Sequence, residues 1–419
     1  MFRPGSHVND RRTANRLLHD PDWRPDTASA RFPTRPAANT IIRHATMETV
    51  GSETRLGQLL RWCEEQQASD LHGCAGKPFT IRQQGRLETV PSSVASPPSE
   101  DTLYSLIREA FSAGVASRID RRLEVDLSFT CGQTRYRANF SKQLGQPAFA
   151  FRAVPRHLLQ LADLQLPQSL VELLNHPRGL ILVTGPTGQG KSTTLRALLQ
   201  EINNSKALRV ITIEDPIEFV FQDHQCRFEQ REVGIDTASF ADGIRNAMRQ
   251  DPNVIFVGEI RDRESIFAAM QAAETGHLVL TTLHADSVPQ AIGRLREYYP
   301  ASEQDGLSSL LSRNLNSILC QRLVPNTAGG RTPCLEILRR TAGVREAIQT
   351  NDLSLLAGII ESAVGEGMHS FDQYLMELLA AGVVDRQTAM HYAVNRHKLE
   401  LSLRGISTRH GILRPDPNR

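Results

Sequence analysis

The chain has 419 residues, of which 40% are hydrophobic and 22% are charged, and its formal net charge at pH 7 is +2. This composition is typical of a soluble protein with about two or three domains, and it provides no strong field of one sign for nucleic acid or acidic lipid. No apolar run approaches the ~20 residues of a membrane span, and the N-terminal residues lack the apolar core of a secretory signal.

The cysteines are spread along the chain, and no two of them form a C-x-x-C pair. This spacing predicts neither a zinc knuckle nor a disulfide framework. We therefore expect reduced thiols in a cytoplasmic protein, at Cys63, Cys74, Cys131, Cys226, Cys320 and Cys334.

Residues 1–50 are rich in Arg, Pro, Asp and Thr without sustained periodicity, which predicts a flexible extension, and Met47 is an alternative start. After them, "LGQLLRWCEEQQASDLH" has apolar residues at helical spacing. The stretches "VDLSFTCGQTRYRANF" and "AFAFRAVP" alternate with period two, as half-buried antiparallel strands do. We predict a small α/β domain over residues 51–153 and a linker over residues 154–168.

Residues 169–404 follow a different pattern. Between residues 179 and 282, helical segments alternate with the short apolar runs "LILVTG", "RVITIED", "VIFVGE" and "LVLTTLH". This alternation predicts a mostly parallel sheet covered by helices. Helical segments from residue 287 to about residue 403 are expected to complete this domain or to add a helical cap, and residues 405–419 to form a loose tail. The predicted fold class is α/β.

The stretch "GPTGQGKST" satisfies the pattern G-x-x-x-x-G-K-[ST]. Glycines let the backbone curl so that its N–H groups face phosphate oxygens, while Lys191 can reach the β and γ phosphates and Ser192 can ligate Mg²⁺. A strand-like run precedes the stretch and a helical one follows it, which is the required context. We predict a nucleoside triphosphate site formed by Gly185, Pro186, Thr187, Gly188, Gln189, Gly190, Lys191, Ser192 and Thr193.

Carboxylates follow two of the predicted strands. "ITIEDPIEF" places Glu214, Asp215 and Glu218 at a strand end, where a parallel sheet binds ligands and where one acid could activate water. The alternative is a polar loop. In "VIFVGEIRD", Gly258 stands where a nucleotide hydrolase usually has a Mg²⁺-holding Asp, and Glu259 follows it. Either this is not a nucleotide site, or its acidic chemistry is spread over other parts of the chain.

Two arginines and two histidines are further candidates. Arg245 and Arg249 lie at i, i+4 in "SFADGIRNAMRQDP", either on a solvated helix face or offered to the phosphates of a neighbouring subunit. In "TGHLVLTTLHADS", His277 lies near the start of a strand and His284 at its end. A lone strand histidine is more often a core residue than a catalyst, but the position of His284 at the ligand edge favours it over His277.

Four motifs, "GPTGQGKST", "TIEDPIEF", "DPNVIFVGEIRD" and "AAETGHLVLTTLHADS", occur in this order. They resemble the Walker A, Asp box, atypical Walker B and His box of the type II/IV secretion hexameric ATPases, and the resemblance spans about residues 55–400. It implies a PAS-like N-terminal domain, a RecA-like core and a ring of six with ATP held between domains. The Gly-then-Glu form of Walker B is the family's own.

The resemblance also implies roles for individual residues. Glu218 would be the catalytic base, and Glu259 would lie near Mg²⁺ and act through water. Arg245 and Arg249 match positions that reach across a subunit interface. In "RYRAN", Arg135 and Arg137 lie on one strand face, where the N-terminal domain of the family approaches nucleotide. His277 is a further possible nucleotide contact.

Within the family, the branch is indicated by shorter stretches. The chain lacks the paired C-x-x-C motif of the pilus-assembly and type II secretion ATPases, and "EGMHSFDQYL" resembles the PilT retraction ATPases. However, "NDLSLLAGII" departs from the PilT pattern, and "LLRWCEEQQASDLH" is most similar to the DotB/TraJ group. We therefore expect an ATPase for type IVB secretion or conjugal transfer, acting with inner-membrane partners at the cytoplasmic face. Type IV pilus retraction is the alternative.

Other classes fit less well. A nucleic-acid translocase would need basic stretches interleaved with aromatic residues, but aromatic residues make up only 5% of the chain. We therefore expect no direct binding of nucleic acid. A nucleotide-gated scaffold without hydrolysis is disfavoured by the complete set of Lys191, Ser192, Glu218 and Glu259, and no acceptor pocket of a small-molecule kinase is evident.

Overall fold

The computed structural model describes residues 48–83, 85–154 and 160–404, which belong to one compact unit, His44–Arg419. Residues 1–47 of the expected extension, part of the expected linker and the expected tail lie outside the described residues. The predicted α/β class is confirmed, because helices accompany two separate seven-stranded sheets.

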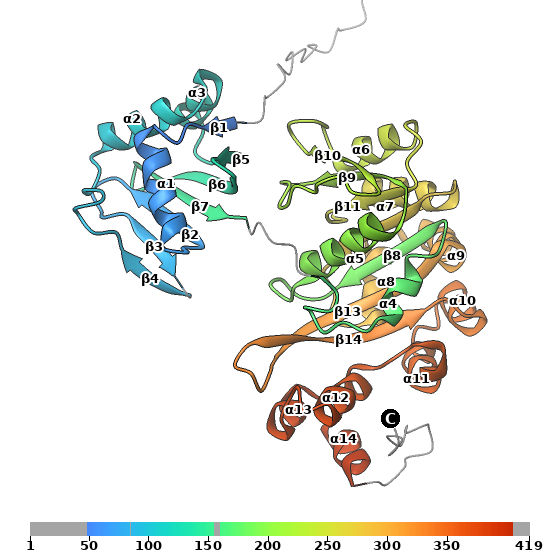
Figure 1. The fold of residues 1–419 in the computed structure, drawn as a ribbon. Coiled ribbons are helices and arrows are strands. Elements are labelled where there is room, and N and C mark those ends of the chain that lie inside the picture. Colours follow the sequence, from blue (N-terminus) through green and yellow to red (C-terminus); the bar gives the residue numbers. More distant parts are fainter. Residues whose placement is uncertain (1–47, 84, 155–159, 405–419) are drawn as a thin grey trace, which may run out of the picture. The chain divides into compact units, whose positions relative to one another are not determined.

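The first sheet has the strand order β1-β5-β6-β7-β2-β3-β4 (Figure 1). Its neighbouring strands are antiparallel except for the parallel pair β1 and β5. Alternate residues of β5, β6 and β7 are buried, and Phe129, Phe140 and Phe151 form edge-to-face ring contacts in this core. The elements are β1 (Glu48–Val50), α1 (Arg55–Glu65), β2 (Asp70–Cys74), β3 (Thr80–Gln83), β4 (Arg86–Thr89), α2 (Glu100–Ala110), α3 (Ala113–Arg121), β5 (Val125–Cys131), β6 (Thr134–Gln143) and β7 (Gln146–Ala153).

The second sheet has the order β10-β9-β11-β12-β8-β13-β14 and is parallel except for the antiparallel pair β13 and β14. Strands β8, β11 and β12 are buried along their whole length, as expected when helices cover both faces. The elements up to the last strand are α4 (Ser169–Leu173), β8 (Gly179–Thr184), α5 (Lys191–Ser205), β9 (Arg209–Glu214), β10 (Arg227–Glu232), α6 (Phe240–Ala247), β11 (Val254–Val257), α7 (Arg263–Glu274), β12 (Leu278–Leu283), α8 (Val288–Glu297), α9 (Gln304–Asn314), β13 (Leu315–Pro325) and β14 (Arg331–Arg339).

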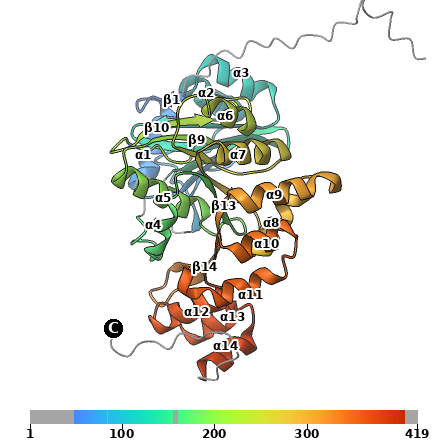
Figure 2. The same cartoon turned by 90° about the vertical axis from the view of Figure 1, so that its right-hand side faces the viewer.

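The remaining helices follow β14, and both views show α11 to α14 grouped together beyond that strand (Figures 1 and 2). They are α10 (Ala342–Gln349), α11 (Leu355–Ser362), α12 (Phe371–Ala380), α13 (Arg386–Tyr392) and α14 (Arg396–Leu403). A search of the described residues finds no helix with both the length and the hydropathy needed to cross a membrane.

Two sequence-based expectations for this domain are wrong. Helical segments were expected from residue 287 onward, and α8, α9 and α10 to α14 are there, but between them β13 and β14 form a long hairpin that completes the sheet. A strand buried on both faces shows no polar alternation, so "SILCQRLV" does not display the period of a strand. Helix α6 was expected to include both Arg245 and Arg249, but it ends at Ala247, so Arg249 lies in the turn that follows.

Candidate active site

The loop between β8 and α5 has the backbone that its glycines predict. Gly188 and Gly190 have φ angles of 79° and 80°, a left-handed conformation that other residues rarely adopt. Lys191 begins α5 with its side chain buried, and its Nζ donates to the carbonyl oxygens of Gly185 at 2.7 Å and Pro186 at 2.9 Å. Burial lowers the pKa of the Lys191 ammonium, and the nearby Glu259 carboxylate opposes that shift.

Lys191 is joined to Glu259 through His284. The Lys191 Nζ lies 3.2 Å from His284 Nδ1, and His284 Nε2 lies 2.8 Å from Glu259 Oε1. Because an ammonium can only donate, Nδ1 accepts, and the imidazole proton is therefore on Nε2, facing the carboxylate. The other oxygen of Glu259 accepts from Arg261 Nε at 2.8 Å. The fold thus brings together residues of the first, third and fourth motifs.

The three carboxylates Glu214, Asp215 and Glu218, at and just after the end of β9, have different surroundings. Glu214 is buried and accepts from Thr212 Oγ1 at 2.7 Å, and burial raises its pKa. Asp215 is partly exposed and lies 3.4 Å from an Arg261 nitrogen. Glu214 is therefore enclosed within the fold, whereas Asp215 is accessible.

Glu218 is held by two arginines. Its Oε1 accepts from Arg137 Nη1 of β6 at 2.7 Å, and its Oε2 accepts from Arg196 Nη2 of α5. Burial lowers the pKa of the Arg196 guanidinium, and Glu214 opposes the shift. Arg135, also from β6, is buried and pairs with Glu232 at 2.8 Å. The strand with "RYRAN" therefore contacts the segment that carries the candidate base.

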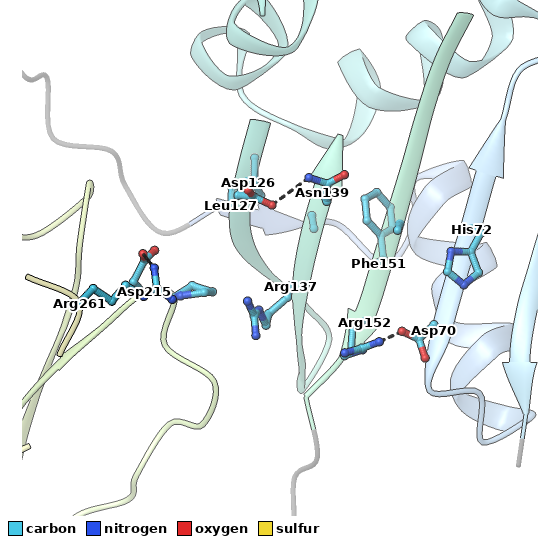
Figure 3. A pocket seen from close by; sticks show the side chains of 13 residues that line it. Asp70, His72, Asp126, Leu127, Arg137, Asn139, Phe151, Arg152, Asp215 and Arg261 are labelled. Atoms are coloured by element: carbon cyan, nitrogen blue, oxygen red, sulfur yellow. Dashed lines mark hydrogen bonds and ion pairs between the residues drawn. The ribbon is translucent and has the colours of Figure 1, made fainter. Parts of the chain in front are cut away.

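A hollow of about 440 Å³ lies next to this contact. Figure 3 shows Arg137 pointing toward Asp215 and Arg261, whereas Arg152 pairs with Asp70. Its lining includes arginines at 137, 152 and 261 and aspartates at 70, 126 and 215, so charges of both signs face it.

A magnesium ion fits the residues at the start of α5. Ser192 is exposed at the first turn, next to the buried Lys191. In the part of the chain that the structure describes, no group of three or more His, Cys, Asp or Glu side chains forms a metal cage. A hydroxyl with one nearby carboxylate is the arrangement expected for Mg²⁺ that is held mainly by phosphates and water. Both oxygens of Glu259 are occupied, which agrees with a contact through water.

Three of the predicted site residues lie away from the phosphate loop, namely Arg245, Arg249 and His277. Arg245 pairs with Asp242 at 2.9 Å and lines a hollow on α7 and α9, and Arg249 is exposed. His277 precedes β12, at the sheet edge opposite the phosphate loop, and its Nδ1 lies 2.9 Å from Ala272 O. The fold of a single chain does not bring these side chains to the loop.

Sequence reasoning missed two residues of the site, Arg196 and Gln321. Arg196 lies among the buried leucines of α5, and Gln321 is a buried amide in the apolar part of β13. A polar residue inside an apolar run was the available signal, because buried polar groups need partners.

The chain is similar to a known protein family, to proteins of that kind and to solved structures. Residues 153–357 match the family described as "Type II/IV secretion system protein". The chain is 38% identical over 338 residues to the "Type IV pilus retractation ATPase PilT" of Pseudomonas aeruginosa, covering 80% of this chain and 97% of that protein. It is similar to the crystal structure of the pilus retraction motor PilT with bound ADP, with 38% identity, a TM-score of 0.76 and coverage of 82% and 98%. For the ATPase DotB of Legionella pneumophila the identity is 26%, the TM-score 0.65 and the coverage 84% and 95%.

These comparisons overturn the expected assignment to the DotB/TraJ group, and with it the expected type IVB secretion or conjugal transfer motor. PilT is more similar in both identity and fold. The stretch that suggested DotB forms α1 and the start of β2, where Leu59, Leu60 and Cys63 are buried. The apolar spacing of this stretch follows from packing in the core of the first domain.

Proposed function

The chain belongs to the type II/IV secretion ATPase family, and on that premise we propose that it hydrolyses ATP to retract type IV pili. The observation that carries this proposal is its similarity to PilT over 97% of that protein. The connected set of Lys191, His284 and Glu259 beside a phosphate loop supports it chemically.

In the proposed reaction, the backbone N–H groups of residues 187–190 and the Lys191 ammonium bind the phosphates. Lys191 must then exchange its bonds to the carbonyl oxygens of Gly185 and Pro186 for bonds to phosphate oxygens. Its Nζ already lies beside the loop, so a short movement of the side chain is sufficient. Mg²⁺ would be held by Ser192 and, through water, by Glu259, and it would supply charge neutralisation at the phosphates.

Glu218 is the proposed general base, and it needs a free oxygen to take a proton from water. Each of its oxygens accepts from one arginine, and opening one of these two bonds would expose that oxygen to the attacking water. Arg137 is the more exposed of the two guanidinium groups, with 42% of its side chain accessible against 16% for Arg196. We infer that Arg137 leaves Glu218 when nucleotide is bound and turns to a phosphate oxygen.

The proposed assembly is a homo-hexamer in which Arg245 and Arg249 act on the nucleotide of a neighbouring subunit. Both arginines are exposed and distant from the phosphate loop in sequence and in the fold, which suits a contact in trans. The proposed location is the cytoplasmic face of the inner membrane, at the pilus machinery.

Lys191→Ala should lower ATP hydrolysis to near background, because it removes the ammonium that offsets phosphate charge at the loop. Phosphate release by the purified protein measures this, with Lys206→Ala as the matched control. Lys206 lies just after the same helix and bonds to Leu174 O and Asn175 Oδ1, so its loss should leave turnover intact. Normal hydrolysis by the Lys191→Ala chain would refute the proposed site.

Retraction itself is tested in the bacterium that carries the gene. A deletion should leave cells with surface pili that do not retract and with no twitching. The unmodified gene should restore both, and the Lys191→Ala gene should restore neither. Deleted cells that retract pili normally would contradict the proposed motor.

A further inference from the structure

Gln321 of β13 lies against the phosphate loop and is 1% exposed. Its Nε2 donates to the carbonyl oxygen of Gln189 at 2.6 Å, and its Oε1 accepts from Thr194 Oγ1 of α5 at 2.7 Å. A carbonyl oxygen can only accept, so the amide nitrogen must face Gln189. The side chain therefore joins the loop to the helix that follows it.

The strand also lies very close to both ends of the loop. A Cβ atom at Gly185 would be 2.3 Å from the backbone oxygen of Gln321, and one at Gly190 would be 2.9 Å from its Nε2. In addition, the Leu323 N–H donates to Gln189 Oε1 at 2.6 Å. Strand β13 thus holds Gln189 by its main chain and by its side chain.

These contacts fix the orientation of one peptide group. In a planar trans peptide, the carbonyl of Gln189 and the N–H of Gly190 point in opposite directions. With the carbonyl bound to Gln321, the Gly190 N–H must point away from β13. We propose that Gln321 is a positioning residue of the phosphate loop, which keeps the Gly190 N–H available to a phosphate oxygen.

The inference predicts a specific effect on nucleotide affinity. Without the bond from Gln321, the peptide between Gln189 and Gly190 can turn its carbonyl oxygen toward a bound phosphate, which would repel it. A residue that only completes the core would change stability and leave affinity unaltered. The two roles are therefore separable by experiment.

The experiment uses the full chain and ADP as the probe, and it rests on the proposed nucleotide site. Gln321→Met keeps the length of the side chain and removes both of its hydrogen bonds. We expect an ADP Kd and an ATP KM about tenfold higher, with kcat at saturating ATP changed by less than about twofold. Gln373→Met is the matched control. Gln373 of α12 likewise uses both ends of its amide, accepting from Ser370 N and donating to Glu361 O, so this variant should lower the melting temperature and leave the ADP Kd unchanged.

A Gln321→Met chain that melts earlier but binds ADP as tightly as the unmodified chain would overturn the inference. If that variant does not fold, Thr194→Val asks the same question, because it removes the hydroxyl that anchors the Gln321 amide and should weaken ADP binding several-fold. An unchanged Kd in Thr194→Val would then be the contradicting result. Failure of the unmodified chain to bind ADP would refute the proposed function, and the inference with it.

Discussion

A carboxylate can take a proton from water only when one of its oxygens faces that water. Glu218 has Arg137 on one oxygen and Arg196 on the other, whereas Glu259 has His284 on one and Arg261 on the other. The two acids differ in the parts of the molecule to which these partners connect them. Glu259 is connected through the imidazole to Lys191, which suits a group that orders the phosphate side of the site. Glu218 is connected to β6 of the other sheet through Arg137. This suits a base whose carboxylate becomes available when the bond to Arg137 opens.

Glu218→Gln should lower kcat by ~10²–10⁴-fold while ATP binding persists, because the amide keeps the shape and one acceptor but cannot take a proton at neutral pH. Single-turnover hydrolysis and a fluorescent ATP analogue measure the two effects separately. Glu229→Gln provides the control, since Glu229 also pairs with two arginines, on β10. An equal loss of binding in Glu218→Gln would assign Glu218 a structural role.

Glu259→Gln should raise the Mg²⁺ concentration needed for half-maximal hydrolysis several-fold, because the carboxylate charge next to the metal is lost. A titration with Mg²⁺ at fixed ATP measures this shift. The His284 Nε2–H can still donate to the amide oxygen, so the link to Lys191 should persist. A variant with normal Mg²⁺ dependence would place Glu259 outside the metal's surroundings.

At the scale of elements, the sequence predicted strands and helices wherever the spacing of apolar residues indicated which face of an element is buried. The run before Gly185 and the leucines of α5 identify the strand, the loop and the helix of the phosphate site. The β13–β14 hairpin was not recognised, because its apolar residues are buried on both faces. The role of Gln321 could not be predicted for a further reason. It depends on β13 lying beside β8, a pairing between residues more than a hundred positions apart.

Arg137→Ala tests the contact between β6 and the segment that carries Glu218. Losing a charge-assisted hydrogen bond and a candidate phosphate contact should lower kcat about tenfold or more. Arg152→Ala is the matched control from the same sheet, because Arg152 lines the same hollow but pairs with Asp70. If both variants hydrolyse ATP at the same rate, β6 has no specific role in the reaction.

At the scale of the whole molecule, the described residues hold most of the proposed chemistry, and the two arginines proposed to act in trans lie away from the phosphate loop of their own chain. Arg245 is engaged with Asp242 and lies 3.7 Å from Glu264, and Arg249 is exposed after α6. Neither contacts the phosphate loop of its own chain among the described residues. Their proposed role therefore requires a second subunit, which makes assembly a condition for hydrolysis.

A mixing experiment tests this condition. Lys191→Ala chains retain both arginines but lack the loop ammonium, and Arg249→Ala chains retain the loop. An arginine supplied in trans can contribute ~10³–10⁵ in rate, so each parent alone should be nearly inactive. In mixed rings, an intact loop from one parent can meet an intact arginine from the other, and part of the activity should return.

Chromatographic sizing with ATP should show a species about six times the 46.6 kDa of one chain. Arg294→Ala, an arginine on α8, should be fully active alone and serves as the matched control. Full hydrolysis by a chain that remains monomeric at the assay concentration would exclude the ring, and with it the proposed action in trans.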